Sequence, residues 1–208
     1  MSMASSSRTV SAGVAALFFA MCGSAQADLV DRGSGLIYDT DLNVTWAANA
    51  NINGAMDWNT ASTWAAGLVY GGISGWRLPT ADPSCGLAYN CTGSEMGHLF
   101  YSELGGVAGI NIATTHNANY SLFSNVVFND YWLGTEYAPN TELGWDFNTS
   151  VGRQDANYKY NDLYAWPVHD GDVAAPIPEP ETYAMLLAGL SLLGFMGRRG
   201  KQKEAAAI

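Results

Sequence analysis

The sequence predicts an α+β fold, in which helices and strands occupy separate stretches of the chain. Two observations predict this class. Residues 57–72 and 92–106 have apolar side chains at helical spacing. A β-meander is predicted before these helices and a mainly antiparallel β region after them, because apolar and polar residues alternate there between Gly-rich turns.

The first predicted element is the β-meander. Its alternating apolar residues are Leu29, Val30, Leu36, Ile37, Tyr38, Leu42, Val44 and Trp46. Asp39, Asp41 and Asn43 have the spacing of the first ligands of a calcium loop. Val44, however, stands where such a loop requires Gly. We interpret the three polar residues as turn residues, with a calcium loop as the alternative, and predict neither a metal nor a cofactor.

Two helices are predicted next. The apolar face of the first consists of Trp58, Ala61, Ala65 and Leu68, and that of the second of Met96, Leu99, Phe100 and Leu104. Asp57 is the expected N-cap of the first helix, and the glycines at 71–72 are its expected end. Thr92 and Glu95 have the spacing of a capping box at the start of the second helix, which should end at residues 105–106.

The second half of the body is the predicted β region. Its strand-like runs are residues 122–128, 130–137, 143–150 and 164–170. Trp132 and Trp145 lie within these runs and are expected in the core. Tyr158 and Tyr160 lie in a polar segment and are the better candidates for exposed aromatic rings.

The body between the hydrophobic chain ends is strongly acidic. Residues 28–178 contain 16 acidic and four basic side chains, a net charge of −12. A surface of this charge repels nucleic acid and anionic lipid, so we exclude nucleic acid as a partner. In an exported chain, we expect Cys85 and Cys91 to form a disulfide, with a metal or redox pair as the alternative.

The N-terminal residues have the parts of a secretory signal peptide. Arg8 provides a basic start, residues 14–21 form a short apolar run, and residues 25–27 form a small-residue cleavage site. We predict a signal peptide over residues 1–27, with the Sec translocon and signal peptidase as partners. A buried N-terminal helix is the alternative.

A second hydrophobic segment lies near the C-terminus. Residues 182–197 carry no charge, and a basic tail, residues 198–208, follows them. As a helix the segment would be about 24 Å long, which is short against a hydrocarbon core of about 30 Å. We predict a marginal transmembrane helix with its basic tail in the cytoplasm. An amphipathic helix of the body is the alternative, although the segment is apolar on all faces.

The residues that frame this segment are Pro178, Glu179 and Pro180 before it and Arg198 and Arg199 after it. This order resembles the PEP-CTERM sorting signal of bacterial exopolysaccharide producers. The resemblance implies that an exosortase-type membrane protease removes the tail, leaving the body at the cell surface or outside the cell. The two prolines disfavour helix here and leave an extended backbone that a protease can bind.

Short blocks of the body resemble a known family. They are residues 44–51 (VTWAANAN), 75–80 (GWRLPT), 131–138 (YWLGTEYA) and 165–172 (AWPVHDGD). In this order they resemble the DUF1566 domain, which is also found at the C-terminus of a Legionella collagen-like adhesin. The RLPT sequence before an acidic helix is also similar to the formylglycine-generating sulfatase-modifying family. Both resemblances imply a C-type-lectin-like fold, with two helices and a twisted antiparallel sheet, over residues 28–172; residues 173–181 would be a linker.

One of these blocks contains the motif Trp76, Arg77, Leu78 and Pro79. Arg77 is one of few basic residues in an acidic body, so we expect it to be half-buried and paired with Glu95 or Glu136, while Trp76 fills the core. A sugar-binding or catalytic arginine is the alternative.

Motifs for catalysis are sparse. The histidines are His98, His116 and His169, and neither HExxH nor GxSxG occurs. We expect His98 to be a packed or surface histidine and predict no enzyme activity, with a hydrolase that uses two carboxylates as the alternative. The sequence thus predicts a surface or matrix protein that binds exopolysaccharide or another glycan, with Tyr158 and Tyr160 as candidate contacts. A purely structural matrix component is the other alternative.

Overall fold

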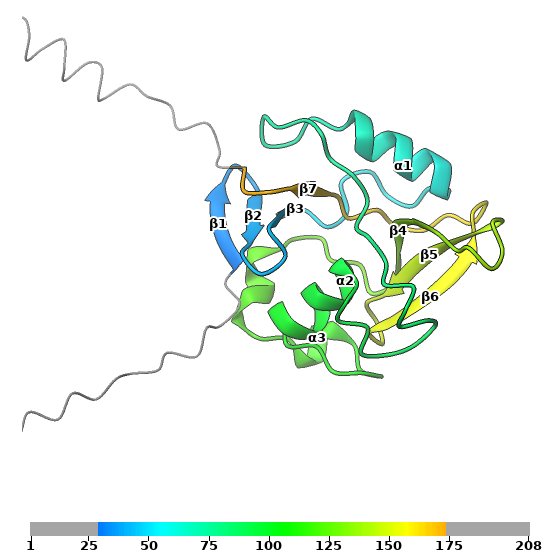
Figure 1. The fold of residues 1–208 in the computed structure, drawn as a ribbon. Coiled ribbons are helices and arrows are strands. Elements are labelled where there is room, and N and C mark those ends of the chain that lie inside the picture. Colours follow the sequence, from blue (N-terminus) through cyan, green and yellow to red (C-terminus); the bar gives the residue numbers. More distant parts are fainter. Residues whose placement is uncertain (1–28, 174–208) are drawn as a thin grey trace, which may run out of the picture.

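Two small antiparallel sheets lie on opposite sides of the domain, with helices between and around them (Figure 1). The structure, a computed structural model, describes residues 29–173. The first sheet has the strand order β1-β2-β3-β7 and the second the order β4-β5-β6. The predicted α+β class is therefore confirmed.

The first sheet joins the two ends of the described chain. The predicted meander forms β1 (Leu29–Gly33), β2 (Leu36–Asp39) and β3 (Val44–Ala47), and β7 (Val168–Asp170) pairs antiparallel with β3. Gly33 and Gly35 make the first turn with positive φ angles, which residues with a Cβ adopt only with strain. Arg32 forms an ion pair with Asp172 at 2.6 Å, so both ends of the described chain lie on one side of the domain (Figure 1).

The second sheet consists of β4 (Asp130–Glu136), β5 (Leu143–Asn148) and β6 (Arg153–Tyr158). The first two strands correspond to predicted runs. The sequence does not predict β6, because its residues, RQDANY, lack apolar alternation; it is a strand because it pairs with β5 along its whole length. The predicted run at residues 122–128 is not a strand, since Leu122 ends a 3-10 helix and Phe123 packs into the core.

Helix α1 (Trp58–Gly67) corresponds to the first predicted helix. Asp57 is its N-cap, and its carboxylate accepts hydrogen bonds from the backbone N–H groups of the first turn. Ala61 and Ala65 are fully buried on its inner face. The indole of Trp58 donates to the Leu133 carbonyl in β4 at 2.8 Å, which attaches the helix to the second sheet. The helix ends before the expected glycine pair.

The second predicted helix is shorter than expected and starts at a different residue. Helix α2 (Glu95–His98) continues into one π-helical segment, η1 (Leu99–Glu103). Its N-cap is Ser94, whose hydroxyl accepts from the Gly97 N–H at 3.1 Å. The predicted capping box of Thr92 and Glu95 is wrong, because the Glu95 carboxylate accepts from the backbone N–H of Thr80 instead. Helix α3 (Ile112–Thr115) and the 3-10 helix η2 (Ala118–Leu122) follow.

Large aromatic side chains fill the core. Trp46, Trp76, Trp132 and Trp166 are almost completely buried, and Trp145 is buried as well. The expected core positions of Trp76, Trp132 and Trp145 are thus observed. The rings of Trp46 and Trp166 meet edge to face with centroids 5.9 Å apart, which joins β3 to the segment before β7. Such rings bury large apolar areas and dominate the energetics of a small core.

The predicted signal peptide, sorting motif, transmembrane helix and basic tail lie outside the described residues. Between Leu29 and Val173, no helix is long and apolar enough to cross a membrane. The structure therefore concerns the acidic body of the chain.

Candidate functional site

Arg77 lies at the centre of an ion-pair network. Its guanidinium contacts both carboxylate oxygens of Glu95, at 2.7 and 2.8 Å, and the Asp170 carboxylate at 2.5 Å. The hydrogen-bonded Glu95 carboxylate raises the pKa of Arg77, and Arg77 in turn lowers the pKa of Asp170. The expected pairing with Glu95 is observed, whereas Glu136 pairs with Lys159 instead. The guanidinium therefore connects α2 to β7 with bidentate geometry.

The backbone of Arg77 and the neighbouring residues of the WRLP motif also make contacts within the domain. The backbone N–H and carbonyl of Arg77 both pair with Val168 in β7, and the Pro79 carbonyl accepts from Gly134 in β4 at 2.7 Å. Leu78 is buried against α1 and β4 in the second core cluster. This segment thus links the two sheets.

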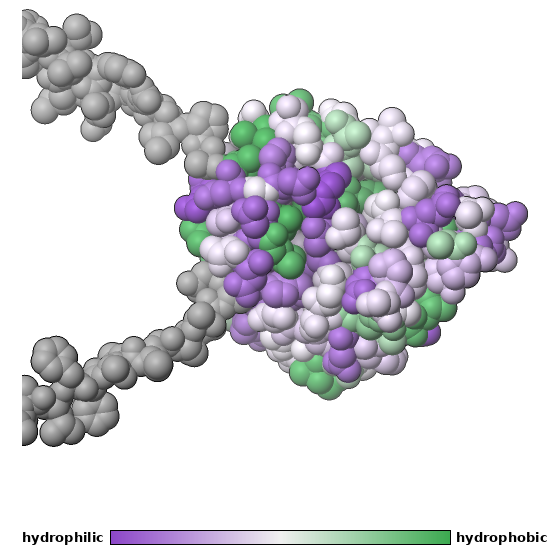
Figure 2. Space-filling model, in the orientation of Figure 1, coloured by the Kyte–Doolittle hydropathy of each residue, from purple (hydrophilic) through white to green (hydrophobic). Residues whose placement is uncertain are grey.

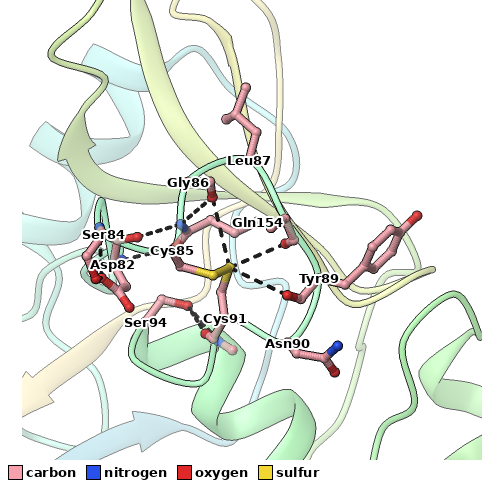
Figure 3. Close-up of a disulfide and its surroundings, with 12 residues drawn as sticks. Asp82, Ser84, Cys85, Gly86, Leu87, Tyr89, Asn90, Cys91, Ser94 and Gln154 are labelled. Atoms are coloured by element: carbon pink, nitrogen blue, oxygen red, sulfur yellow. Dashed lines mark hydrogen bonds between the residues drawn. A yellow bond between two sulfur atoms is a disulfide. The ribbon is translucent and has the colours of Figure 1, made fainter.

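The disulfide between Cys85 and Cys91 closes a short loop. A side chain from the second sheet binds this loop through hydrogen bonds. Figure 3 shows Gln154 of β6 reaching towards this loop. Its amide nitrogen donates to the carbonyls of Asp82 and Gly86, at 2.8 and 3.1 Å, and its amide oxygen accepts from the Asp82 N–H at 3.0 Å. Gln154 is fully buried, so its side chain fixes the loop against β6.

A hollow of about 200 Å³ lies between the disulfide loop and the β4–β5 hairpin. Its walls include Gly86, Glu136, Tyr137 and Trp145. The rings of Tyr137 and Trp145 meet edge to face, with centroids 4.9 Å apart. The hollow is therefore lined by two aromatic rings and one carboxylate.

Tyr158 and Tyr160 form an exposed aromatic pair at the end of β6. Their rings stack with centroids 5.1 Å apart and planes inclined by 16°. Tyr160 is 74% exposed and Tyr158 is 43% exposed. Lys159, between them, forms an ion pair with Glu136 and lies over the Trp58 ring, 4.5 Å from its centroid. The two tyrosines therefore stand on a backbone that is anchored to α1 and β4.

The aromatic pair and the chain ends lie on different sides of the domain. In Figure 1, the end of β6 is at the far right, whereas β1 and the end of β7 are at the left. Figure 2 shows this face as a mosaic, with hydrophilic residues over the first sheet and at the tip of the second. Apolar residues form only small separate patches on this face, so it offers a polar surface interrupted by single apolar groups.

A cluster of titratable groups lies beside the first sheet. Asp39 ends β2 and is fully buried; its Oδ1 accepts from the backbone N–H groups of Asp41 and Leu42, as the predicted turn requires. His98 and Glu103 face it from the second helix, with Nε2 and Oε1 3.1 Å apart. Burial raises the pKa of Asp39, and the hydrogen bond with Glu103 raises the pKa of His98.

Asp146 is a buried carboxyl group in β5. Its Oδ2 accepts from the Asn157 amide at 3.2 Å, but its Oδ1 is buried without a donor. Burial, and after it the neighbouring Asp130 carboxylate, raises the pKa of Asp146 to about 8. In its protonated form, Asp146 can donate to Asp130, which satisfies both groups. Because Asp146 has no exposed surface, a substrate cannot reach it, and this pair does not favour the hydrolase alternative.

We expect the Asp146→Asn variant to be more stable than the unmodified chain at alkaline pH, by about 5 kcal/mol at pH 8.5. The folded state binds a proton that the unfolded chain releases above its ordinary pKa near 4. The stability that this proton provides is full below about pH 4 and is lost as the pH rises towards 8. An amide remains neutral and keeps both hydrogen bonds.

Urea unfolding of both proteins between pH 4.5 and 8.5 measures this effect. The exposed Asp162→Asn variant is the matched control, and its stability should follow that of the unmodified chain at every pH. Parallel pH profiles for Asp146→Asn and the unmodified chain would contradict the assignment of a buried neutral carboxyl group.

The fold and these surfaces define a disulfide-bonded α+β domain whose core is closed by its own first and last strands. The chain belongs to the Lcl C-terminal domain family, whose profile matches residues 35–169, well over half of its 208 residues. The PEP-CTERM protein-sorting motif matches residues 176–200. This motif implies an exported protein that exosortase, a membrane protease, recognises. No curated protein matches the chain. The predicted resemblances to the DUF1566 domain and to the PEP-CTERM sorting signal are thus confirmed.

The structure distributes the predicted site residues over three places. Arg77 and Glu95 meet at the junction of α2 and β7, the two cysteines close the loop beside β6, and the tyrosines stand at the end of β6. Sequence reasoning missed the cluster around Asp39, because His98 and Glu103 do not have α-helical spacing. It also missed Gln154, which lies on the strand that the sequence does not predict.

Proposed function

We propose that this exported chain is a surface or extracellular-matrix protein whose Lcl-type domain binds neutral glycan, such as the exopolysaccharide of the producing cell, without catalysis. The observation that carries the proposal is the exposed stack of Tyr158 and Tyr160. Aromatic faces bind the apolar faces of sugar rings, and two side chains with two χ angles each lose little entropy on binding. The net charge of −12 over residues 28–178 favours neutral over anionic glycans.

The position of the stack supports an adhesive role. Before processing, the PEP-CTERM tail would hold the chain at the membrane through the segment that follows Val173. The end of β6, which Tyr158 forms, lies on the side of the domain away from the end of β7, so the aromatic surface would face outwards (Figure 1). The hollow beside Glu136 would add a second subsite, because Glu136 lines it and also holds Lys159 between the two tyrosines.

We expect the Tyr160→Ala variant to bind the producer's exopolysaccharide about tenfold more weakly, which corresponds to about 1.4 kcal/mol, with unchanged stability. Tyr160 is mostly exposed, so its removal leaves the core intact. Retention on immobilised polysaccharide and thermal unfolding measure the two quantities. The Tyr158→Ala variant should behave similarly.

Tyr89→Ala is the matched control, because Tyr89 is 45% exposed but lies in the disulfide loop. Equal retention of the unmodified chain and both stack variants would exclude the stack as the binding surface. A complete lack of retention on polysaccharide would favour the purely structural matrix role. Release of soluble sugar from the polysaccharide by the pure chain would favour an enzyme.

The processing step is tested by mass spectrometry of the protein recovered from the extracellular fraction. We expect a chain that begins at Asp28 and ends near Pro178, Glu179 and Pro180, with or without an attached group. An extracellular chain that still ends at Ile208 would contradict exosortase processing. This outcome is independent of glycan binding, so the two parts of the proposal fail separately.

We also propose that the fold is of the C-type-lectin kind. The pairing of β7 with the N-terminal meander supports this arrangement, because it brings both chain ends into one sheet and leaves the other sheet and its loops free for ligands. A crystal structure with a bound oligosaccharide would test the proposal, and a ligand seated on the first sheet would contradict it.

A further inference from the structure

Four side chains that can bind a divalent cation meet beside the first sheet. Asp39, His98 and Glu103 each offer a ligand atom, and these three atoms lie within 4.8 Å of one another. Asp41 lies at the outer side, with its Oδ2 3.9 Å from Nε2 of His98. Asp39 and Glu103 are almost completely buried, whereas the Asp41 side chain is 49% exposed. The cluster is thus a buried set of ligands with one side open to solvent.

An unsatisfied atom distinguishes this cluster from an ordinary polar contact. Oε2 of Glu103 is buried without a hydrogen-bond partner, and the side chain of Glu103 has no exposed surface through which water could reach it. A buried carboxylate oxygen without a donor is costly, because its hydration is lost and nothing replaces it. A bound cation would give this oxygen a partner.

The local backbone brings the ligands together. In an α-helix, side chains three or four positions apart share a face, but His98 and Glu103 are five positions apart. The segment from Leu99 is π-helical, and the Leu104 N–H bonds to the Leu99 carbonyl, five residues back. This wider turn aligns positions i and i+5 and makes the 3.1 Å contact between His98 and Glu103 possible.

Asp39 has one oxygen free for the cluster. Its Oδ1 accepts two backbone N–H groups of the β2–β3 turn, which fixes the orientation of the carboxylate. Its Oδ2 has only a long contact of 3.4 Å from the indole of Trp46. The turn that orients Asp39 also carries Asp41, so both carboxylates are presented to His98 from one side.

We propose that Asp39, His98 and Glu103, with Asp41 at the open side, bind one divalent transition-metal ion such as Zn²⁺ or Mn²⁺. The mixture of one imidazole and several carboxylates suits these ions, whereas Ca²⁺ prefers oxygen ligands alone. Three ionised carboxylates around a neutral imidazole carry a charge of −3, which a divalent ion largely offsets. The ion would join the β2–β3 turn to the second helix. The proposal does not depend on glycan binding.

The test uses the full-length chain, stripped of metal with a chelator and titrated with Zn²⁺, Mn²⁺ and Ca²⁺ by calorimetry. We expect one equivalent of Zn²⁺ or Mn²⁺ to bind at least about tenfold more tightly than Ca²⁺, and the melting temperature to rise with its concentration. Loss of an outer-shell partner alone weakens metal sites about 10–100-fold, so His98→Asn should weaken binding by at least that much.

Asp41→Asn is the variant that keeps the fold, because Asp41 is half exposed and its own backbone supports the turn. It should lose at least about tenfold in affinity while the metal-free melting temperature stays unchanged. The matched controls are His116→Asn and Asp31→Asn, both at exposed positions of this acidic chain, and neither should change the affinity.

Visible absorption of bound Co²⁺ gives a second readout that does not depend on stability. It should appear with the unmodified chain and disappear with His98→Asn. Three results would each overturn the proposal: no saturable binding of one equivalent, a preference for Ca²⁺, or equal affinity of Asp41→Asn and the unmodified chain. Without saturable binding, His98 would be only part of a polar cluster that supports the turn.

Discussion

Replacing Arg77 with Met is expected to lower the free energy of unfolding by about 3–5 kcal/mol. Methionine fills a similar volume but leaves the Glu95 carboxylate, which is only 12% exposed, without its two charge-assisted hydrogen bonds. The remaining donor to Glu95 is the Thr80 N–H at 2.7 Å. A buried carboxylate that has lost its cation is costly because neither water nor another charge compensates it. Urea unfolding at pH 7 measures the loss.

The position of Arg77 explains why its effect should be large. It is the contact through which α2, the GWRLPT segment and β7 meet, since it binds Glu95 and Asp170 while its backbone pairs with Val168. Arg77→Lys should recover only part of the stability, because an ammonium group cannot bind both oxygens of Glu95 in a planar fork.

Arg153→Met is the matched control. Arg153 also contacts a carboxylate, that of Asp155 at 3.0 Å, but both side chains are about one-third exposed. An exposed pair of this kind contributes about 0–1 kcal/mol. Equal losses for Arg77→Met and Arg153→Met would contradict the structural role of Arg77 as the partner of the buried Glu95 carboxylate. Unchanged stability with lost glycan binding would favour a sugar-binding arginine.

Local pattern predicts those elements whose partners are neighbours in the sequence. The meander β1–β3 is predicted because each strand pairs with the next, so that alternation and turns suffice. Helix α1 is predicted because Asp57 supplies the cap and the alanines the inner face. In both cases the residues that determine the structure lie within the segment itself, so the local sequence is sufficient to predict the element.

Elements that depend on distant partners are not predicted. The polar strand β6 exists because β5 offers a complete ladder of hydrogen bonds. By contrast, the apolar run at 122–128 has β-forming residues but pairs only through an isolated bridge between Ser124 and Asn49. The Val127 N–H bonds to the Tyr131 hydroxyl at 2.7 Å instead of to a strand. Here tertiary contacts override local propensity.

The candidate sites follow the same rule. The Arg77–Glu95 pair is predictable because an isolated arginine in an acidic body needs a carboxylate. The second partner of Arg77, Asp170, and the N-cap of α2 at Ser94 are not predictable in this way. The cluster around Asp39 escapes prediction because its helical members are paired by a π-helical turn. No periodicity rule for an α-helix places His98 beside Glu103.

The second large effect is expected at Gly97, where Ala should destabilise the chain by about 3 kcal/mol or more. A Cβ at this position would lie 1.9 Å from the Cys91 carbonyl oxygen and 2.7 Å from the Ser94 hydroxyl. Helix propensity alone would favour Ala by about 1 kcal/mol, so the expected sign is set by the clash. Thermal and urea unfolding measure the difference.

Gly67→Ala is the matched control, since Gly67 also lies in a helix but a Cβ there meets nothing within 4 Å. It should be neutral or stabilising by up to about 1 kcal/mol. Comparable stability of Gly97→Ala and Gly67→Ala would contradict the close approach of the disulfide loop to α2.

The obstacle at Gly97 is a backbone atom of a residue that is itself held by a disulfide. Cys91 is almost completely buried and bonded to Cys85, so its carbonyl cannot withdraw without moving the loop that Gln154 holds. In a chain with both cysteines replaced by Ser, that carbonyl gains freedom, and the cost of Gly97→Ala should fall. A double-mutant cycle should therefore show coupling of about 0.5–3 kcal/mol between the two changes. If the two changes in unfolding free energy simply add, then α2, and not the disulfide loop, moves to accommodate the added methyl group.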